Sequence, residues 1–166
     1  TIMKHIPNLL TLANLFCGTV AVIFAVQENY INAALFVILG IIFDFFDGFA
    51  ARLLNVSGEL GKQLDSLADM VTSGVVPGII MYNLINVNDR YFLFPKAQEK
   101  TSELLTSSLI PYEFIGLLLT LAACYRLANF NIDTRQSDSF IGLPTPAMSL
   151  FVIALPLIPM YSENQF

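Results

Sequence analysis

Apolar residues occur in five long runs along the chain, separated by short polar segments. The runs extend from about Leu9 to Val26, Ile31 to Leu54, Leu64 to Val87, Leu109 to Arg126 and Leu143 to Tyr161. A helix needs about 20 mainly apolar residues to cross a hydrocarbon core about 30 Å thick, so each run is long enough for one span. The pattern therefore predicts an all-α, polytopic transmembrane helical bundle with at least five spans in this chain.

Composition supports a membrane setting. Of the 166 residues, 55% are hydrophobic and 13% are charged, and a soluble domain of this length needs more charge to cover its surface. The net charge of −5 argues against nucleic acid as a partner. We expect Cys17 and Cys124, which lie in separate apolar runs, to be small packing residues and not a disulfide. The first run lacks a small-residue cleavage site after it, so it reads as a span and not as a removable signal peptide.

The placement of lysine and arginine predicts the orientation of the spans. With the N-terminus inside, the inner segments carry Lys4, Arg52, Lys62, Arg126 and Arg135, and the outer ones carry Arg90, Lys96 and Lys100. This bias favours an inside N-terminus under the positive-inside rule. The end of the second span and the start of the third then lie at the cytoplasmic face, joined by the short segment 55–63. We therefore expect an integral protein of the inner (cytoplasmic) membrane.

Four aspartates flank this short segment. Asp44 and Asp47 are three positions apart and Asp65 and Asp69 are four apart, so each pair shares one helical face. Two helices in a tight hairpin can point all four carboxylates at a common centre. Such carboxylates repel one another in a low-dielectric setting, which protonation, water-filled exposure or bound cations can relieve. Two divalent cations, Mg²⁺ or Mn²⁺, suit an all-oxygen site of this kind and would neutralise it.

Small residues and one arginine are interleaved with the aspartates. Gly48, Ala51 and Gly61 leave room for a bulky group against helix backbone, and Arg52 could neutralise a phosphate. Glycine and alanine in membrane helices more often serve helix packing, and a single aspartate near a span end is more often interfacial. The combination is harder to explain in that way, and it favours a site.

The segment reads D44-x-x-D47-G48-x-x-A51-R52, then eight residues, then G61-x-x-x-D65-x-x-x-D69, which resembles the signature of the CDP-alcohol phosphotransferase family. The resemblance implies one membrane domain over residues 1–166, built on a six-helix core that is often dimeric, so a homodimer is expected. It also implies a cytosol-facing polar cavity in which an alcohol displaces CMP from a CDP-linked lipid. Because relatives usually continue with further spans, we expect the C-terminus to be truncated or continued elsewhere.

The resemblance also implies roles for individual residues. Asp44, Asp47 and Asp65 would hold the metals, and Asp69 would both touch a metal and act as the base for the acceptor hydroxyl. A nucleotide pocket would be lined by residues of the signature and of the first span, namely Gly48, Ala51, Arg52, Gly61, Pro7, Asn8, Thr11 and Asn14.

Two flanking segments, HIPNLLTLANLFCG and YRLANFNIDTRQSDSFIGLPTPA, resemble the membrane-type phosphatidylserine synthases within this family. That resemblance implies CDP-diacylglycerol as donor and L-serine as acceptor. Arg126 is the candidate for the serine carboxylate, although it could equally be a cytoplasmic anchor. Asn129, which stands where relatives often have arginine, and Asn131 and Asp133 are further candidates for acceptor binding.

Other functions remain open at this stage. Intramembrane acids often mark a cation or proton pathway, so a transporter is the rival from another class. A transporter predicts acids spread through the membrane depth, whereas these cluster at one end of two adjacent spans. A non-catalytic scaffold would have no use for the four aspartates. Within the enzyme class, glycerol 3-phosphate or an inositol phosphate could replace serine as acceptor.

Overall fold

The structure, a computed structural model, describes residues 5–56, 58–87, 112–132 and 144–159. In chain order, its elements are α1 (His5–Val26), α2 (Tyr30–Leu53), α3 (Glu59–Asp69), the π-helical turn η2 (Met70–Val75), α4 (Val76–Val87), the 3₁₀ turn η3 (Tyr112–Leu117), α6 (Leu118–Ile132) and α7 (Thr145–Ala154). Four stretches in these ranges are long and apolar enough to cross a membrane: His5–Val26, Tyr30–Leu53, Glu59–Asn86 and Glu113–Ile132. The predicted polytopic all-helical fold is confirmed.

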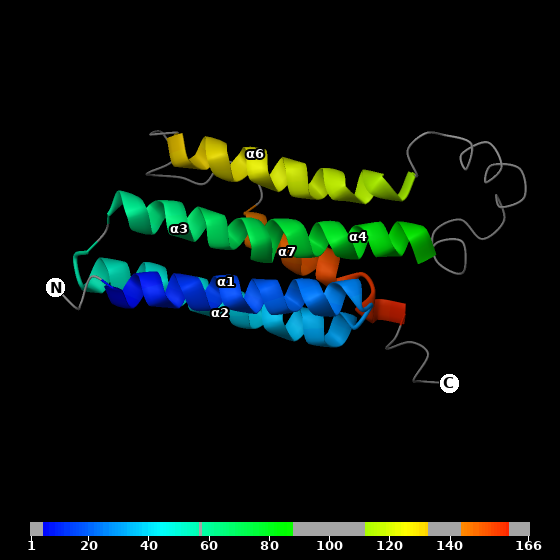
Figure 1. Cartoon of the computed structure of the whole chain (residues 1–166), viewed down its shortest axis with the longest axis horizontal. Coiled ribbons are helices and arrows are strands. Elements are labelled where there is room, and N and C mark those ends of the chain that lie inside the picture. The colour runs from blue at the N-terminus through cyan, green and yellow to red at the C-terminus, as the bar shows by residue number, and fades with distance from the viewer. Residues whose placement is uncertain (1–4, 57, 88–111, 133–143, 160–166) are drawn as a thin grey trace, which may run out of the picture.

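The long helices run side by side along the length of the molecule (Figure 1). Helices α1 and α2 form an antiparallel pair, and α3, η2 and α4 follow one another as a continuous rod beside it. Helix α6 lies along the other side of that rod, while α7 packs against α4, η2 and α2. The starts of α1 and α3 and the ends of α2 and α6 therefore meet at one end of the bundle.

Several helix boundaries differ from those that the apolar runs predict. The third span begins at Glu59 and not near Leu64, and α6 continues past Arg126 to Ile132. The two extensions are joined by a hydrogen bond from Lys62 Nζ to the backbone carbonyl oxygen of Asn131. The fifth expected span corresponds to α7, a helix of 10 residues that ends at Ala154, two positions before Pro156. Proline lacks the backbone donor that a continuing helix needs.

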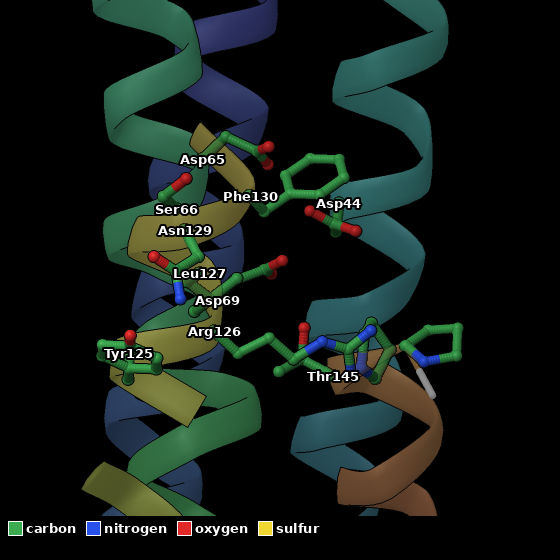
Figure 2. A pocket seen from close by; sticks show the side chains of 12 residues that line it. Asp44, Asp65, Ser66, Asp69, Tyr125, Arg126, Leu127, Asn129, Phe130 and Thr145 are labelled. Atoms are coloured by element: carbon green, nitrogen blue, oxygen red, sulfur yellow. The ribbon is translucent and has the colours of Figure 1, made fainter. Parts of the chain in front are cut away.

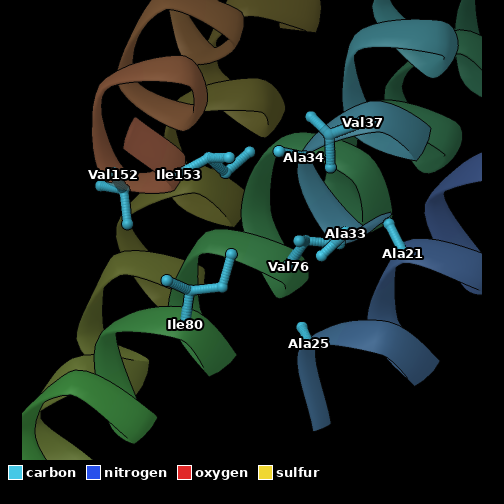
Figure 3. Packing of buried hydrophobic residues seen from close by; sticks show 9 residues of the cluster. All are labelled: Ala21, Ala25, Ala33, Ala34, Val37, Val76, Ile80, Val152 and Ile153. Atoms are coloured by element: carbon cyan, nitrogen blue, oxygen red, sulfur yellow. The ribbon is translucent and has the colours of Figure 1, made fainter. Parts of the chain in front are cut away.

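The bundle centre is packed with small and β-branched side chains (Figure 3). The cluster consists of Ala21, Ala25, Ala33, Ala34, Val37, Val76, Ile80, Val152 and Ile153. Alanines on α1 and α2 let the two backbones approach closely, which favours association of helices in lipid. Both cysteines are free, as predicted, but only Cys17 is buried. Cys124 is exposed and is not the packing residue that we expected.

The contact between the rod and α6 depends on Gly78 and Thr120. A side chain at Gly78 would overlap the Thr120 hydroxyl, so this glycine allows α6 to lie against α4. Thr120 Oγ1 donates a hydrogen bond of 3.0 Å to the carbonyl oxygen of Gly74 in η2. Since lipid offers no hydrogen bonds, this bond satisfies a carbonyl near the π turn and holds the two segments together. Docking of α6 in turn brings its polar C-terminal half beside α3.

Candidate active site

The four aspartates lie on two helices joined by a short hairpin. Asp44 and Asp47 belong to α2, and Asp65 and Asp69 belong to α3. The chain reverses after α2 at Asn55, which has a φ of 51°, a conformation that asparagine tolerates better than most residues. In Figure 2, Asp44 projects from α2 toward Asp65 and Asp69 on α3. The predicted convergence of the two helix faces is therefore present in the fold.

Three of these carboxylates form a compact group. Asp44, Asp47 and Asp65 each offer an oxygen atom, and these atoms lie within 4.8 Å of one another. Asp47 is 5% exposed, and the Thr11 hydroxyl of α1 donates a hydrogen bond to its Oδ2. An all-oxygen, closely spaced carboxylate set is the donor chemistry that Mg²⁺ and Mn²⁺ prefer. These side chains fit a divalent cation, as the sequence predicts.

Two cavities flank the aspartates. The smaller has a volume of about 340 Å³ and lies among α1, α2 and the start of α3. Its lining residues are Pro7, Asn8, Thr11, Asp47, Gly48, Ala51, Arg52, Val56, Gly58, Gly61, Lys62 and Asp65. A side chain at Gly48 would meet no atom within 4 Å, so the helix backbone is open to the cavity there. We call this space the hairpin cavity.

The larger cavity has a volume of about 460 Å³ and lies on the other side of Asp65. Helices α2, α3, α6 and α7 contribute its lining, shown in Figure 2: Asp44, Asp65, Ser66, Asp69, Tyr125, Arg126, Leu127, Asn129, Phe130, Pro144, Thr145 and Pro146. Among the described residues that line it, Arg126 is the one basic side chain. We call this space the interhelical cavity. Asp65 borders both cavities, so the carboxylate group lies where they meet.

Arg126 is half-buried on α6, six residues before the helix ends. In Figure 2 its side chain extends from α6 toward Thr145 at the start of α7. Within the described ranges, no carboxylate forms an ion pair with its guanidinium. An arginine inside an apolar span is costly unless it meets a partner or a water-filled space. Because Arg126 lies on the wall of the interhelical cavity, that space is available to its charge, and its roles in acceptor binding and as an anchor both stay predictions.

Two predicted binding residues lie outside the cavity walls. Asn14, which the resemblance implies for the nucleotide pocket, is fully buried and donates from Nδ2 to Asp69 Oδ1 at 3.3 Å. Asn131, a candidate for acceptor binding, instead exchanges hydrogen bonds with Ser66, the shorter being 2.8 Å from Asn131 Nδ2 to Ser66 Oγ. The backbone carbonyl oxygen of Asn131 accepts a hydrogen bond of 2.7 Å from Lys62 Nζ. Asp133 lies outside the described residues.

The sequence pattern did not single out Ser66, Tyr125 or Thr145 as site residues. Ser66 lies three positions before Asp69 on the same helical face, a spacing that could have indicated it. Thr145 is 7% exposed and comes from a segment nearly 80 residues further along the chain. No local pattern links it to the aspartates, because only helix packing brings the two segments together.

Comparison with known proteins agrees with this geometry. The sequence profile of the CDP-alcohol phosphatidyltransferase family matches residues 4–163. The chain is 34% identical over 157 residues to the CDP-diacylglycerol–serine O-phosphatidyltransferase of Bacillus subtilis, covering 92% of this chain and 76% of that protein. It is 33% identical over 154 residues to the enzyme of the same name from Helicobacter pylori, covering 92% of this chain and 57% of that protein.

A relative with another acceptor in its name matches a shorter region. The CDP-diacylglycerol–glycerol-3-phosphate 3-phosphatidyltransferase of Aquifex aeolicus is 43% identical over 67 residues, which cover 40% of this chain and 38% of that protein. No solved structure was found to match. The family profile spans nearly the whole sequence, and the four aspartates of the chain lie together at one site. The chain therefore belongs to the CDP-alcohol phosphatidyltransferase family.

Proposed function

We propose that this protein transfers the phosphatidyl group of CDP-diacylglycerol to the hydroxyl of L-serine, giving phosphatidylserine and CMP. The observation that carries the proposal is the meeting of two cavities at the aspartates, with Asp65 in the wall of both. A transferase needs a donor and an acceptor on either side of its reacting centre. The names of the Bacillus and Helicobacter relatives state this reaction.

The hairpin cavity suits the CDP portion of the donor. Gly48 leaves helix backbone open there, and Arg52 and Lys62 line the same space. Two basic side chains offset the charge of a diphosphate, and arginine can bind a phosphate through two parallel hydrogen bonds. Asn8 and Thr11 of α1 close the opposite wall. We therefore assign the nucleotide to this cavity.

The carboxylate group would hold the divalent cations. Asp44, Asp47 and Asp65 are the proposed ligands, with Asp69 adjoining them on α3. Bound Mg²⁺ or Mn²⁺ would supply positive charge that stabilises the phosphoryl oxygens and the departing phosphate. Without cations, a diphosphate beside these carboxylates would be strongly repelled.

Asp69 is the proposed general base. It lines the interhelical cavity, where it faces the acceptor, and it is absent from the wall of the hairpin cavity. In the proposed reaction, the serine oxygen forms a bond to the lipid-attached phosphorus and the bond from that phosphorus to CMP breaks. The serine hydroxyl is a poor nucleophile at neutral pH, so its proton passes to the Asp69 carboxylate as attack proceeds.

Charge in the interhelical cavity favours a zwitterionic acceptor. Three carboxylates and one arginine are among its described lining residues. Arg126 is suited to the serine carboxylate, and the buried Thr145 hydroxyl beside it offers a further hydrogen bond. An acidic side chain is suited to the ammonium group. A phosphorylated alcohol brings about two negative charges and would need more basic partners than this wall offers.

The test is CMP release from CDP-diacylglycerol by the purified protein, with serine, glycerol 3-phosphate and inositol phosphate supplied in turn. We expect release with serine and little release with the phosphorylated alcohols. Preference for glycerol 3-phosphate would refute the serine assignment and leave the family assignment intact. The cytoplasmic orientation of the site and the homodimer remain predictions, which protease accessibility in oriented vesicles and the oligomeric mass in detergent can check.

A further inference from the structure

Two buried polar side chains lie directly behind Asp69, and neither lines the hairpin cavity or the interhelical cavity. Asn14 of α1 is 0% exposed and Thr72 of η2 is 1% exposed. Each polar group inside an apolar bundle costs free energy unless a hydrogen bond satisfies it. Their presence therefore calls for an explanation other than contact with a ligand.

The two side chains form a hydrogen-bonded chain that ends on Asp69. Thr72 Oγ1 donates to Asn14 Oδ1 at 2.8 Å, and Asn14 Nδ2 donates to Asp69 Oδ1 at 3.3 Å. A carboxylate can only accept hydrogen bonds, so the amide nitrogen of Asn14 must face Asp69. The amide oxygen then faces Thr72, whose hydroxyl must donate. Each link fixes the direction of the next one.

Neighbouring glycines make room for this chain. A Cβ at Gly40 of α2 would lie 2.9 Å from Asn14 Oδ1 and 3.0 Å from Thr72 Cγ2. A Cβ at Gly18 of α1 would overlap the Thr72 hydroxyl. Larger residues at these positions would push Asn14 and Thr72 apart. Helices α1 and α2 and the turn η2 thus pack closely around the hydrogen bond between Thr72 and Asn14.

We infer that Asn14 and Thr72 are positioning residues that hold the Asp69 carboxylate in its orientation toward the interhelical cavity. The bond from Asn14 fixes Oδ1 of Asp69 and thereby the plane of the carboxylate that lines the interhelical cavity. The inference deepens the proposed function, on which it rests, and it gives Asn14 a role that acts through Asp69 and not on the nucleotide. Thr72 acts one step further back by fixing the Asn14 amide.

The test compares Thr72→Val, which keeps the side-chain shape and removes the hydroxyl, with Thr72→Ser, which keeps the hydroxyl. Loss of an outer-shell partner typically costs about tenfold to a hundredfold in activity. We expect Thr72→Val to lower kcat by about tenfold, with the KM values for CDP-diacylglycerol and serine within about twofold of wild type. Thr72→Ser should recover most of that loss, and Asn14→Ala should lower kcat at least as far as Thr72→Val.

Ser73→Ala is the matched control. Ser73 is the neighbouring residue, is 1% exposed, and its hydroxyl has no hydrogen-bond partner among the described residues. Its kcat should stay at the wild-type value. Folding of each variant is checked by its elution and thermal unfolding in detergent, and only variants that match wild type are compared.

Two results would overturn the inference. One is an equal fall in kcat for Thr72→Ser and Thr72→Val, which would indicate packing and not hydrogen bonding. The other is a raised KM for CDP-diacylglycerol with unchanged kcat in Asn14→Ala, which would indicate nucleotide binding. Assays use whichever alcohol supports CMP release by the wild type, so failure of serine as acceptor is recorded separately from failure of the inference.

Discussion

The two cavities beside the aspartates differ in origin and in charge. The hairpin cavity is formed by the first turns of α1 and by the α2–α3 hairpin, so its lining residues range from position 7 to position 65. The interhelical cavity combines α2 and α3 with α6 and α7, so its lining residues range from position 44 to position 146. The first has two basic and two acidic lining residues, and the second has one basic and three acidic ones.

This difference supports the proposal that one site holds two unlike substrates. The balanced charge of the hairpin cavity suits a diphosphate together with cations. The acidic interhelical cavity suits a small molecule that carries its own positive charge. A helical hairpin can thus supply the donor half of the site, while the helices packed against it set the acceptor.

Removal of divalent metal should have the largest effect, because both cavities border the carboxylate group. Excess EDTA should abolish CMP release and weaken CDP binding, and added Mg²⁺ or Mn²⁺ should restore both. CMP release and calorimetric titration with CDP measure the two effects. Full turnover in EDTA would contradict the proposed role of the carboxylates.

Substitution of single aspartates should separate the two cavities. Asp69→Asn should lower turnover by about a hundredfold to ten-thousandfold, since an amide cannot take the acceptor proton, while CDP binding is largely retained. Asp65→Asn should impair both turnover and CDP binding, because Asp65 borders both cavities. Asp44→Asn should also weaken metal and nucleotide binding. Equal loss of CDP affinity in all three variants, measured by calorimetry, would remove the support for Asp69 as the base.

The two arginines provide a reciprocal comparison. Arg126→Ala should raise the KM for serine by about tenfold to a hundredfold with little change in the KM for CDP-diacylglycerol, because hydrogen bonds to charged groups contribute about 1.5–3 kcal/mol. Arg52→Ala should raise the KM for CDP-diacylglycerol with little change in the KM for serine. Each variant serves as the control for the other in steady-state kinetics. If both variants changed the same KM, the assignment of the substrates to separate cavities would be wrong.

The smallest effect should come from the hydrogen bonds between α3 and α6. Asn131→Ala removes the bonds to Ser66 and should lower the free energy of unfolding by about 1 kcal/mol. Thermal and denaturant unfolding in detergent measure this change. Since Ser66→Ala breaks the same contact, the double variant should cost less than the sum of the two single ones. Strict additivity would indicate that the contact contributes nothing.

The sequence by itself determined the helical bundle and most of the residues in the proposed donor half of the site. The spans follow from apolar length, because a bilayer admits backbone only as satisfied helices or closed barrels. Aspartates three and four positions apart share a helical face, and a short hairpin brings the two faces together. Seven predicted nucleotide residues line one cavity because they lie at the same ends of adjacent helices: Pro7, Asn8, Thr11, Gly48, Ala51, Arg52 and Gly61.

Tertiary structure alone decided which further residues join Asp69, Arg126 and Asn129 in the proposed acceptor half, and which side chains lie behind Asp69. Thr145 reaches the interhelical cavity because α7 packs against η2 and α2, a contact that no local spacing encodes. Asn14 and Asn131 are polar residues in helices, and the sequence gives no sign of whether such groups meet a ligand or one another. Their partners, Thr72 and Ser66, lie 58 and 65 positions away in the chain. Helix packing determines these partners, because a buried polar group must form a hydrogen bond with a residue of the helix that lies beside it.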